Sequence, residues 1–179
     1  MIFAPMRNLE TERLRLRKFE VDDAPQVFRN YANNPNVTKY LTWPTHSSVE
    51  GSYGYTNYVV KNYETGRSYE WAIVPKDFGE VIGSISIVRI REEKDDVEIG
   101  YCIGEAFWHQ GITSEALQAV LGFVKKEMKP KRIFAVHDVN NPHSGDVMKK
   151  CGMKFFAASE GYNNHGLCTK NEYEIILKK

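Results

Sequence analysis

The sequence predicts a mixed α/β fold of the α+β kind, in which helices cover both faces of a mostly antiparallel sheet. Three observations predict it. Apolar residues recur at every second position in several short segments, as in strands with one buried face. Other segments carry apolar residues at helical spacing. No linker or repeat divides the 179 residues, so a single domain over residues 1–179 is expected.

The first part of the chain is expected to form one strand and two helices. Residues 9–19 alternate leucine with arginine, which predicts a strand with one buried face. A helix opens at residues 21–25, where acidic residues and a proline suit the first turn, and residues 33–36 end it. A second helix near residues 47–50 is less marked, because two glycines follow and lower the helix propensity.

The middle of the chain predicts three strands in an antiparallel meander. Residues 69–74, 81–91 and 97–103 show the strand period and are joined by turn-like segments. The clearest helix covers residues 113–127, where apolar side chains share one face. A short buried strand follows at residues 133–136.

The last part predicts one helix and two strands. The helix covers residues 144–150 and ends at Gly152, since glycine suits a left-handed cap. The strands cover residues 153–158 and 173–177. The whole order is β-α-α-β-β-β-α-β-α-β-β, which places helices on both faces of the sheet.

Composition and charge exclude several classes of protein. Hydrophobic residues make up 42% and charged residues 26%, which argues against disorder and long coiled coils. Lys and Arg total 24 against 23 Asp and Glu, so a nucleic-acid partner is not expected. No segment has the length of a signal peptide or a spanning helix, so no membrane partner is expected either.

The cysteines and histidines predict neither disulfides nor a metal site. Three scattered cysteines do not form a disulfide framework, and a reducing, cytoplasmic setting is expected. His165 and Cys168 have no second pair at metal-site spacing. Cys102 has no evident base partner, so a buried, inert thiol is expected there rather than a nucleophile.

The segment with most chemical information is WHQGITSEA at residues 108–116, which joins a strand to the clearest helix. Backbone N–H groups of such a loop can point at an anion, helped by the helix dipole, and Gly111 lets the backbone approach closely. An ordinary helix start is the alternative, with Ser or Thr as the cap and Glu115 placed against the dipole. Taken alone, the segment leaves both interpretations open.

Neighbouring motifs change that balance, because together they resemble the GNAT superfamily of acetyl-coenzyme A-dependent N-acetyltransferases. The similarity is greatest to the branch of ribosomal-protein N-terminal alanine acetyltransferases, and it covers almost the whole chain. Its pieces are ETERLRLR at 10–17, WAIV at 71–74, VIGSI at 81–85, EIGY at 98–101, the segment at 108–116, and Asn141 with Ser144.

The resemblance implies a GNAT-like sheet and acetyl-coenzyme A as co-substrate. The glycine loop would hold the pyrophosphate, and the strand before it would pair with the pantetheine arm where it splays from the next strand. Asn141 and Ser144 match positions near the sulfur. The cofactor-binding residues expected by resemblance are Tyr101, Cys102, Ile103, His109, Gln110, Gly111, Ile112, Thr113, Ser114, Asn141 and Ser144.

Two positions depart from the family pattern. Thr113 stands where the family often has Gly or Ala. Met148 stands where many relatives carry a tyrosine acid, and a thioether cannot donate a proton, so Ser144 is the nearest candidate acid. Lys149 and Lys150 either contact phosphates or lie on the solvated surface.

Acetyl transfer to an amine requires a base, an oxyanion donor and a leaving thiolate. Glu98 is the candidate catalytic base, directly or through water, because it lies in a strand between apolar residues. The alternative is a glutamate at the solvent end of that strand. Ser144 is the candidate acid, or else a helix-start residue. By resemblance, the N–H of Tyr101 or Ile103 is the oxyanion donor.

The amine acceptor is less defined by the sequence. A protein or peptide N-terminus is the leading expectation, and a polyamine, antibiotic or other small amine is the alternative. A non-catalytic acyl-coenzyme A sensor and a homodimer also stay open. By family architecture, residues 40–44 and the hairpin tip at residues 161–166 are expected to flank the acceptor cleft.

Overall fold

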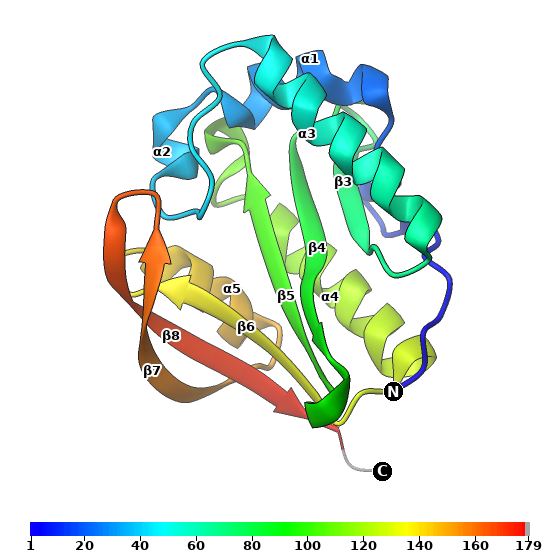
Figure 1. Ribbon diagram of the computed structural model, residues 1–179, viewed down its shortest axis with the longest axis vertical. Coiled ribbons are helices and arrows are strands. Elements are labelled where there is room, and N and C mark those ends of the chain that lie inside the picture. Colours follow the sequence, from blue (N-terminus) through cyan, green and yellow to red (C-terminus); the bar gives the residue numbers. More distant parts are fainter. Residues whose placement is uncertain (178–179) are drawn as a thin grey trace.

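The computed structural model describes residues 1–177, and its centre is one eight-stranded sheet with the order β1-β2-β3-β4-β5-β6-β8-β7 (Figure 1). All neighbouring strands are antiparallel except β5 and β6, which run parallel. The strands are β1 (Leu9–Glu10), β2 (Leu14–Arg17), β3 (Glu70–Pro75), β4 (Gly83–Arg91), β5 (Asp96–Ile103), β6 (Arg132–Asp138), β7 (Lys154–Asn163) and β8 (Gly166–Ile176). The expected mixed, mostly antiparallel sheet is confirmed.

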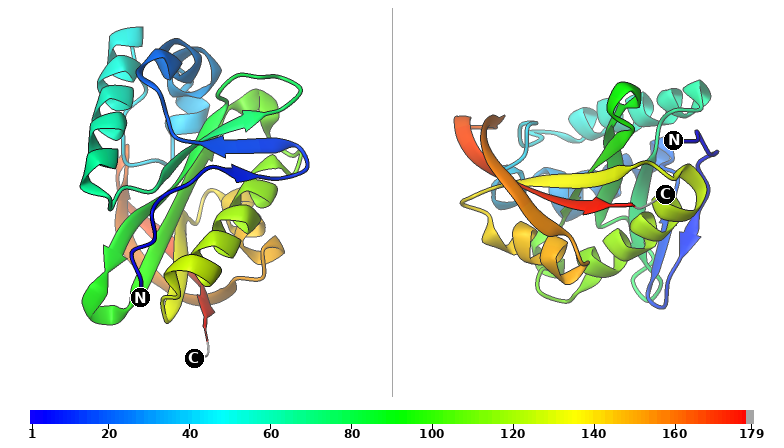
Figure 2. Two further views of the ribbon diagram at one scale, coloured as in Figure 1. Left: turned by 90° about the vertical axis from the view of Figure 1, so that its right-hand side faces the viewer. Right: turned by 90° about the horizontal axis from the view of Figure 1, so that it is seen from below.

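Helices cover both faces of this sheet, as expected: α3 lies on one face and α4 on the other (Figure 2). Each face has its own apolar core, one built with Leu117 and Val120 of α4 and the other with Val59 of α3. The helices are α1 (Ala24–Val27), α2 (Pro35–Thr38), α3 (Val49–Asn62), α4 (Ile112–Phe123) and α5 (Pro142–Lys150). No helix of the described residues is long and apolar enough to cross a membrane.

The N-terminal segment differs from the expected single strand over residues 9–19. It forms β1 and β2, which pair antiparallel with Leu9 opposite Leu16. The reason is a tight turn: the Thr11 hydroxyl accepts a hydrogen bond from the Leu14 N–H, at 2.9 Å, and interrupts the extended backbone. The leucine alternation correctly predicts the buried face, but it does not reveal the turn.

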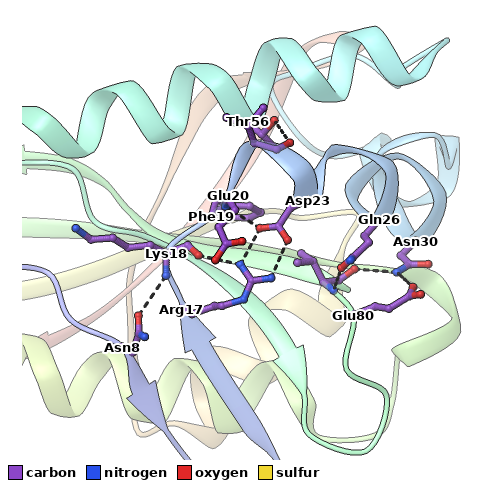
Figure 3. Close-up of polar contacts among 12 residues, drawn as sticks. Asn8, Arg17, Lys18, Phe19, Glu20, Asp23, Gln26, Asn30, Thr56 and Glu80 are labelled. Atoms are coloured by element: carbon purple, nitrogen blue, oxygen red, sulfur yellow. Dashed lines mark hydrogen bonds and ion pairs between the residues drawn. The ribbon is translucent and has the colours of Figure 1, made fainter.

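A polar network fixes the helices after β2 against the sheet (Figure 3). The guanidinium of Arg17 forms two hydrogen bonds to the Asp23 carboxylate, each 2.7 Å long. The N–H of Glu20 donates to the same carboxylate, so Asp23 caps the 3₁₀ turn Val21–Asp23 that precedes α1. A separate hydrogen bond joins Asn30 to the carbonyl of Val81, just before β4. Val27 and Tyr31, in the helical segment that these bonds hold, line the first cavity described below.

The remaining elements follow the expected order with shifted ends, except that a short additional helix, α2, begins at Pro35, within the segment expected only to end the first helix. The hairpin β7–β8 is longer than expected, because β7 continues to Asn163 and β8 starts at Gly166. Its turn therefore lies at residues 164–165 rather than over 161–166. The end of α5 is as expected, since Gly152 has a φ of +81°.

Strands β5 and β6 separate along their length. They pair at three positions only, from Asp96 opposite Arg132 to Glu98 opposite Phe134. Beyond Glu98 the two strands diverge towards the upper part of Figure 1. The gap implied by the family resemblance is therefore present, and it opens the backbone edge of residues 99–103.

Candidate active site

Two adjoining cavities lie on either side of the gap between β5 and β6. The first has a volume of about 970 Å³ and the second about 680 Å³. Residues that line both cavities include Tyr101, Cys102, Asn141 and Ser144. The cavities therefore meet at the C-terminal half of β5 and the start of α5. A group held in the second cavity can thus reach a group held in the first, and we call these the acceptor cavity (first) and the cofactor cleft (second).

The glycine loop forms one wall of the cofactor cleft and starts helix α4. Gly111 has a φ of +76° and His109 a φ of +60°, which turns the backbone sharply before Ile112. The first N–H groups of a helix have no partner inside it, so those at the start of α4 are available to an anion. This geometry supports the anion-binding interpretation of the segment.

Two cations stand beside Gly111. A methyl group built on Gly111 would lie 3.6 Å from Nη2 of Arg13 and 3.9 Å from Nζ of Lys150. The absence of a side chain thus leaves a small space between two positive charges, next to the N-terminus of a helix. A diphosphate carries the charge and the acceptor oxygens that suit such a space. The residues present therefore fit the phosphates of coenzyme A.

Glu115 holds Arg13 in this position. Its carboxylate accepts hydrogen bonds from the Thr11 hydroxyl at 2.6 Å and from Nε of Arg13 at 2.7 Å. Arg13 also donates Nη1 to the carbonyl of Gln110, at 3.0 Å. Burial alone would raise the pKa of Glu115, but these hydrogen bonds outweigh it and the pKa is lowered. Glu115 therefore stays ionised and orients Arg13. This role goes beyond the favourable interaction with the helix dipole that the sequence indicated.

The structure separates the two lysines that the sequence left undecided. Lys150 lines the cofactor cleft, near Gly111. Lys149 points elsewhere and forms an exposed ion pair with Asp146, at 3.1 Å. Only Lys150 is thus placed to contact a phosphate.

The free edge of β5 offers backbone donors to the gap. Gly104 donates its N–H to Ile82, on the β4 side of the strand. Because N–H groups alternate in direction along a strand, those of Tyr101 and Ile103 face away from β4, towards β6. The carbonyl of Ile103 points the same way and accepts Nε1 of Trp108, at 3.0 Å. Both predicted oxyanion donors therefore face the gap.

Tyr101 and Ser144 form a closed pair of hydrogen bonds across this gap. The Ser144 hydroxyl donates to the Tyr101 oxygen at 3.2 Å, and the Tyr101 hydroxyl donates to the Ser144 carbonyl at 2.8 Å. Burial raises the pKa of Tyr101, so the phenol keeps its proton. Met148, at the position of the family tyrosine, is 1% exposed and belongs to the core. Tyr101 and Ser144 thus bring two hydroxyl groups to the place where both cavities meet.

Glu98 lines the acceptor cavity from β5, at the last position where β5 pairs with β6 before the gap. It is 7% exposed, and its one ion pair is with the exposed Arg89, at 3.4 Å. Burial raises the pKa of Glu98, although Arg89 and Lys170 oppose that shift. The edge-glutamate interpretation fits poorly with this burial. A carboxyl of raised pKa that faces a cavity can accept a proton near neutral pH.

Cys102 lies between the two cavities but lacks the properties of a nucleophile. Burial raises the pKa of its thiol to about 11, so the thiolate is scarce at neutral pH. Its neighbour is the hydroxyl of Ser84, at 3.4 Å. Among residues 1–177, no group of three or more His, Cys, Asp or Glu side chains is arranged to hold a metal ion.

Most of the expected cofactor-binding residues come together, and one does not. Gln110 does not line the cofactor cleft, and its side chain turns back to the carbonyl of Ala106. In the loop at residues 40–44, Tyr40 and Leu41 line both cavities. The tip of the β7–β8 hairpin lines neither of them. The expected residues that line the cleft are Tyr101, Cys102, Ile103, His109, Gly111, Ile112, Thr113, Ser114, Asn141 and Ser144.

Two features of the site were not expected from the sequence. Arg13 belongs to an arginine-rich run, where alternation indicates only which side chains leave the core. The hydroxyl of Tyr101 was not considered, because Tyr101 was singled out for its backbone. Both features depend on the topology of the sheet. Predicting them requires knowing that the segment with Arg13 lies beside the start of α4 and that β5 lies beside the start of α5.

Comparison with known proteins gives three concordant similarities. Residues 13–154 match the model of the acetyltransferase (GNAT) domain. An uncharacterised N-acetyltransferase of Bacillus licheniformis, p20, is 33% identical over 138 residues, which cover 76% of this chain and 77% of that protein. The ribosomal protein uS5 alanine N-acetyltransferase of Escherichia coli K12 is 25% identical over 164 residues, covering 88% and 81%.

A solved structure is similar over the same extent. The crystal structure of a GNAT-family acetyltransferase from Bacillus anthracis superposes with a TM-score of 0.83 at 26% identity, covering 95% of this chain and 98% of that one. The similarity includes the sheet that forms both cavities. Sequence, fold and site geometry therefore lead to the same group of enzymes.

Proposed function

This chain belongs to the GNAT acetyltransferase family, and we propose that within it the acceptor is the N-terminal amine of a protein or peptide. The chain is an acetyl-coenzyme A-dependent N-acetyltransferase. The observation that carries the proposal is the meeting of the two cavities at Tyr101 and Ser144, with Glu98 on the acceptor side. The similarity to an alanine N-acetyltransferase supports the choice of an α-amine.

The lining of the cofactor cleft supports roles for the residues around the glycine loop. The N–H groups at the start of α4, with Arg13 and Lys150, hold the diphosphate of the co-substrate. Asn141 and the open edge of β5 lie along the path from that loop to the gap. The thioester carbonyl then meets the N–H of Tyr101 or Ile103, which stabilises the charge that develops on its oxygen.

The acceptor amine must reach this carbonyl without its extra proton. An α-amino group has a pKa near 8, so most of it is protonated at pH 7 and must lose that proton before it can attack. Glu98 takes that proton, directly or through one water. The neutral amine attacks in a ternary complex, so no protein nucleophile is required, in accord with the high pKa of Cys102.

The departing thiolate of coenzyme A takes up a proton at the end of the reaction. A free thiol has a pKa of about 8.5, so this protonation is helpful without being decisive. Ser144 is the nearest hydroxyl to donate, and Tyr101 sets its orientation through their two hydrogen bonds.

A small amine is the second candidate acceptor, and one observation favours it. The acceptor cavity, at about 970 Å³, lies within the range of small-molecule sites of roughly 300–1,000 Å³. A peptide N-terminus would place its first residues in the same volume and leave the rest of the chain outside. The two candidates therefore differ outside the cavity: a small amine would be enclosed by it, whereas a peptide would continue beyond it.

The test is a panel of acceptors assayed for release of the coenzyme A thiol, with product mass as confirmation. We expect peptides with a free α-amine to be acetylated and the same peptides with a blocked α-amine to be inert, even when they contain lysine. Acetylation of small amines with no peptide turnover would favour the second candidate. Absence of thiol release with every amine would overturn the proposal.

A further inference from the structure

A second carboxylate, Glu70, faces the acceptor cavity from β3. One of its oxygens accepts a very short hydrogen bond from the hydroxyl of Tyr55, on α3. The hydroxyl of Tyr31 lines the same cavity. Glu70, Tyr55 and Tyr31 come from three separate elements, and we call them the Glu70 cluster.

The Glu70 cluster is not a structural ion pair. Among the described residues 1–177, no Lys, Arg or His forms an ion pair with Glu70, and its second oxygen has no hydrogen-bond partner. Two arginines that line the cavity are engaged elsewhere, since Arg67 pairs with Glu92 and Arg89 with Glu98, and Lys170 acts electrostatically on Glu98. A mostly buried carboxylate without a counterion lowers the stability of the fold, so a contribution to stability does not explain why Glu70 lies there.

The Tyr31 hydroxyl extends the cluster. Tyr31 is 1% exposed, and its hydroxyl interacts with the Tyr55 hydroxyl, whose proton goes to Glu70. The Tyr31 oxygen therefore receives no proton from Tyr55 and keeps a free acceptor position. A phenol oxygen without a donor can accept a hydrogen bond from an N–H group.

The lining of the cavity also suits a cation. Aromatic rings of Tyr31, Trp43 and Tyr55 surround the space, and no described cation lies over any of these three rings. Aromatic faces attract ammonium and guanidinium groups, especially where water is excluded. The cavity therefore combines a carboxylate, a phenol oxygen with a free acceptor position and aromatic side chains.

The register of the sheet places this cluster at a defined distance from the reacting centre. Glu70 lies opposite Ser86 on β4, and Ser86 lies opposite Gly100 on β5. Two strand spacings of about 4.8 Å put Glu70 about 10 Å from the backbone of β5. Glu98 is the carboxylate on the strand that borders the gap, and Glu70 lies two strands away from it across the sheet.

We propose that the Glu70 cluster binds a second cationic nitrogen of the acceptor, so that the preferred substrates carry an ammonium or guanidinium group a few bonds beyond the amine that is acetylated. In a peptide this group is the side chain of a first-residue lysine or arginine. In a small acceptor it is the far nitrogen of a diamine. The inference rests on the proposed function and adds to it a rule of substrate selection.

The experiment compares acceptors that differ only in the second nitrogen. One arm uses 1,5-diaminopentane against pentylamine, and the other uses a peptide that begins with lysine against one that begins with norleucine. A charge-assisted hydrogen bond predicts that kcat/KM of the dicationic member is higher by about 10- to 100-fold. Calorimetric titration of the same pairs into the protein with coenzyme A should show the same order of affinity.

Variants then assign the preference to the cluster. Glu70→Gln keeps an acceptor for Tyr55 but removes the charge, so the ratio between paired acceptors should fall towards one. Glu64→Gln is the matched control, because Glu64 is exposed and does not line the cavity. It should keep the wild-type ratio. Melting temperatures verify that both variants fold, and the wild-type comparison stands without them.

Each outcome bears on one proposal. Equal kcat/KM and equal affinity for paired acceptors in the wild-type enzyme would overturn the inference while leaving the proposed function intact. A preference that persists in folded Glu70→Gln would also overturn it. A preference in one arm only identifies the source of the cation. If no amine is acetylated, the proposed function fails, and the calorimetric comparison still decides whether the cluster binds a dication.

Discussion

The hydroxyl of Ser144 donates a hydrogen bond to the Tyr101 oxygen at 3.2 Å, while the Tyr101 hydroxyl donates to the Ser144 carbonyl at 2.8 Å. These residues come from β5 and α5, the two elements beside the gap. The pair therefore fixes the start of α5 against the open strand edge. It also means that the Ser144 proton has a resting partner, from which it must turn to reach a leaving thiolate.

The first prediction concerns this pair. Ser144→Ala should lower kcat by about tenfold, the low end of the range for acid catalysis, because a thiolate leaves without much help. Tyr101→Phe keeps the ring but removes both hydrogen bonds, so Ser144 loses its orientation and kcat should fall by a similar factor. If the two residues act as a unit, the double variant is no slower than either single one. Steady-state kinetics at saturating co-substrate measure this, and unchanged kcat in Ser144→Ala would exclude an acid role for the serine.

The second prediction concerns Gly111. A carboxylate introduced by Gly111→Asp would lie beside Arg13 and Lys150, offset half of their positive charge, and repel the diphosphate. We expect calorimetry to show severe loss of acetyl-coenzyme A affinity. Gly111→Asn is the matched control, because asparagine has the same size, tolerates the positive φ and carries no charge. Equal affinities of the two folded variants would contradict a role for charge at this position.

The third prediction separates the cations. Lys150→Gln and Arg13→Gln should each weaken acetyl-coenzyme A binding by about tenfold and reduce its dependence on salt, because each removes a phosphate contact. Lys149→Gln should leave affinity unchanged, since Lys149 does not line the cleft and its ammonium pairs with Asp146. Titrations at two salt concentrations test all three. An effect of Lys149→Gln as large as that of Lys150→Gln would show that only net charge matters.

The order of elements could be predicted because it depends on local periodicity. The alternation in residues 83–91 and 96–103 and the apolar face of α4 are properties of adjacent residues. The turn between β1 and β2 could not be predicted in this way. It depends on Thr11, which bonds to Leu14 nearby and to Glu115 in a distant helix.

The site follows the same division. The glycine loop and Glu98 are visible in the sequence because their chemistry belongs to one segment. Arg13 and Glu70 are not, because the role of each depends on a partner more than ten positions away. The opposite assignments of Lys149 and Lys150 depend on which face of α5 turns towards the loop, and only the three-dimensional structure establishes that.

The last prediction begins with the effect of Glu98 on stability. Burial raises its pKa in the folded chain above the unfolded value of about 4.3. The folded state then holds the proton more tightly, so this group stabilises the fold below about pH 4.3 and that contribution is lost as pH rises through the folded pKa. At pH 7 the buried charge is a cost, and Glu98→Gln should melt at a higher temperature than wild type. The difference should shrink at pH 4.

The same variant should lose activity at the pH where it gains stability. If Glu98 accepts the amine proton, Glu98→Gln lowers kcat/KM by roughly 10²-fold between pH 6.5 and 7. The deficit should shrink towards pH 9, where an α-amine is already neutral. A Glu98 that only attracts a cationic acceptor would instead change KM, and added salt would reduce its effect. Rate profiles at two salt concentrations, with melting curves at each pH, separate these roles, because a base lost without loss of stability cannot be explained by misfolding. Parallel profiles of wild type and variant at every pH would count against the base.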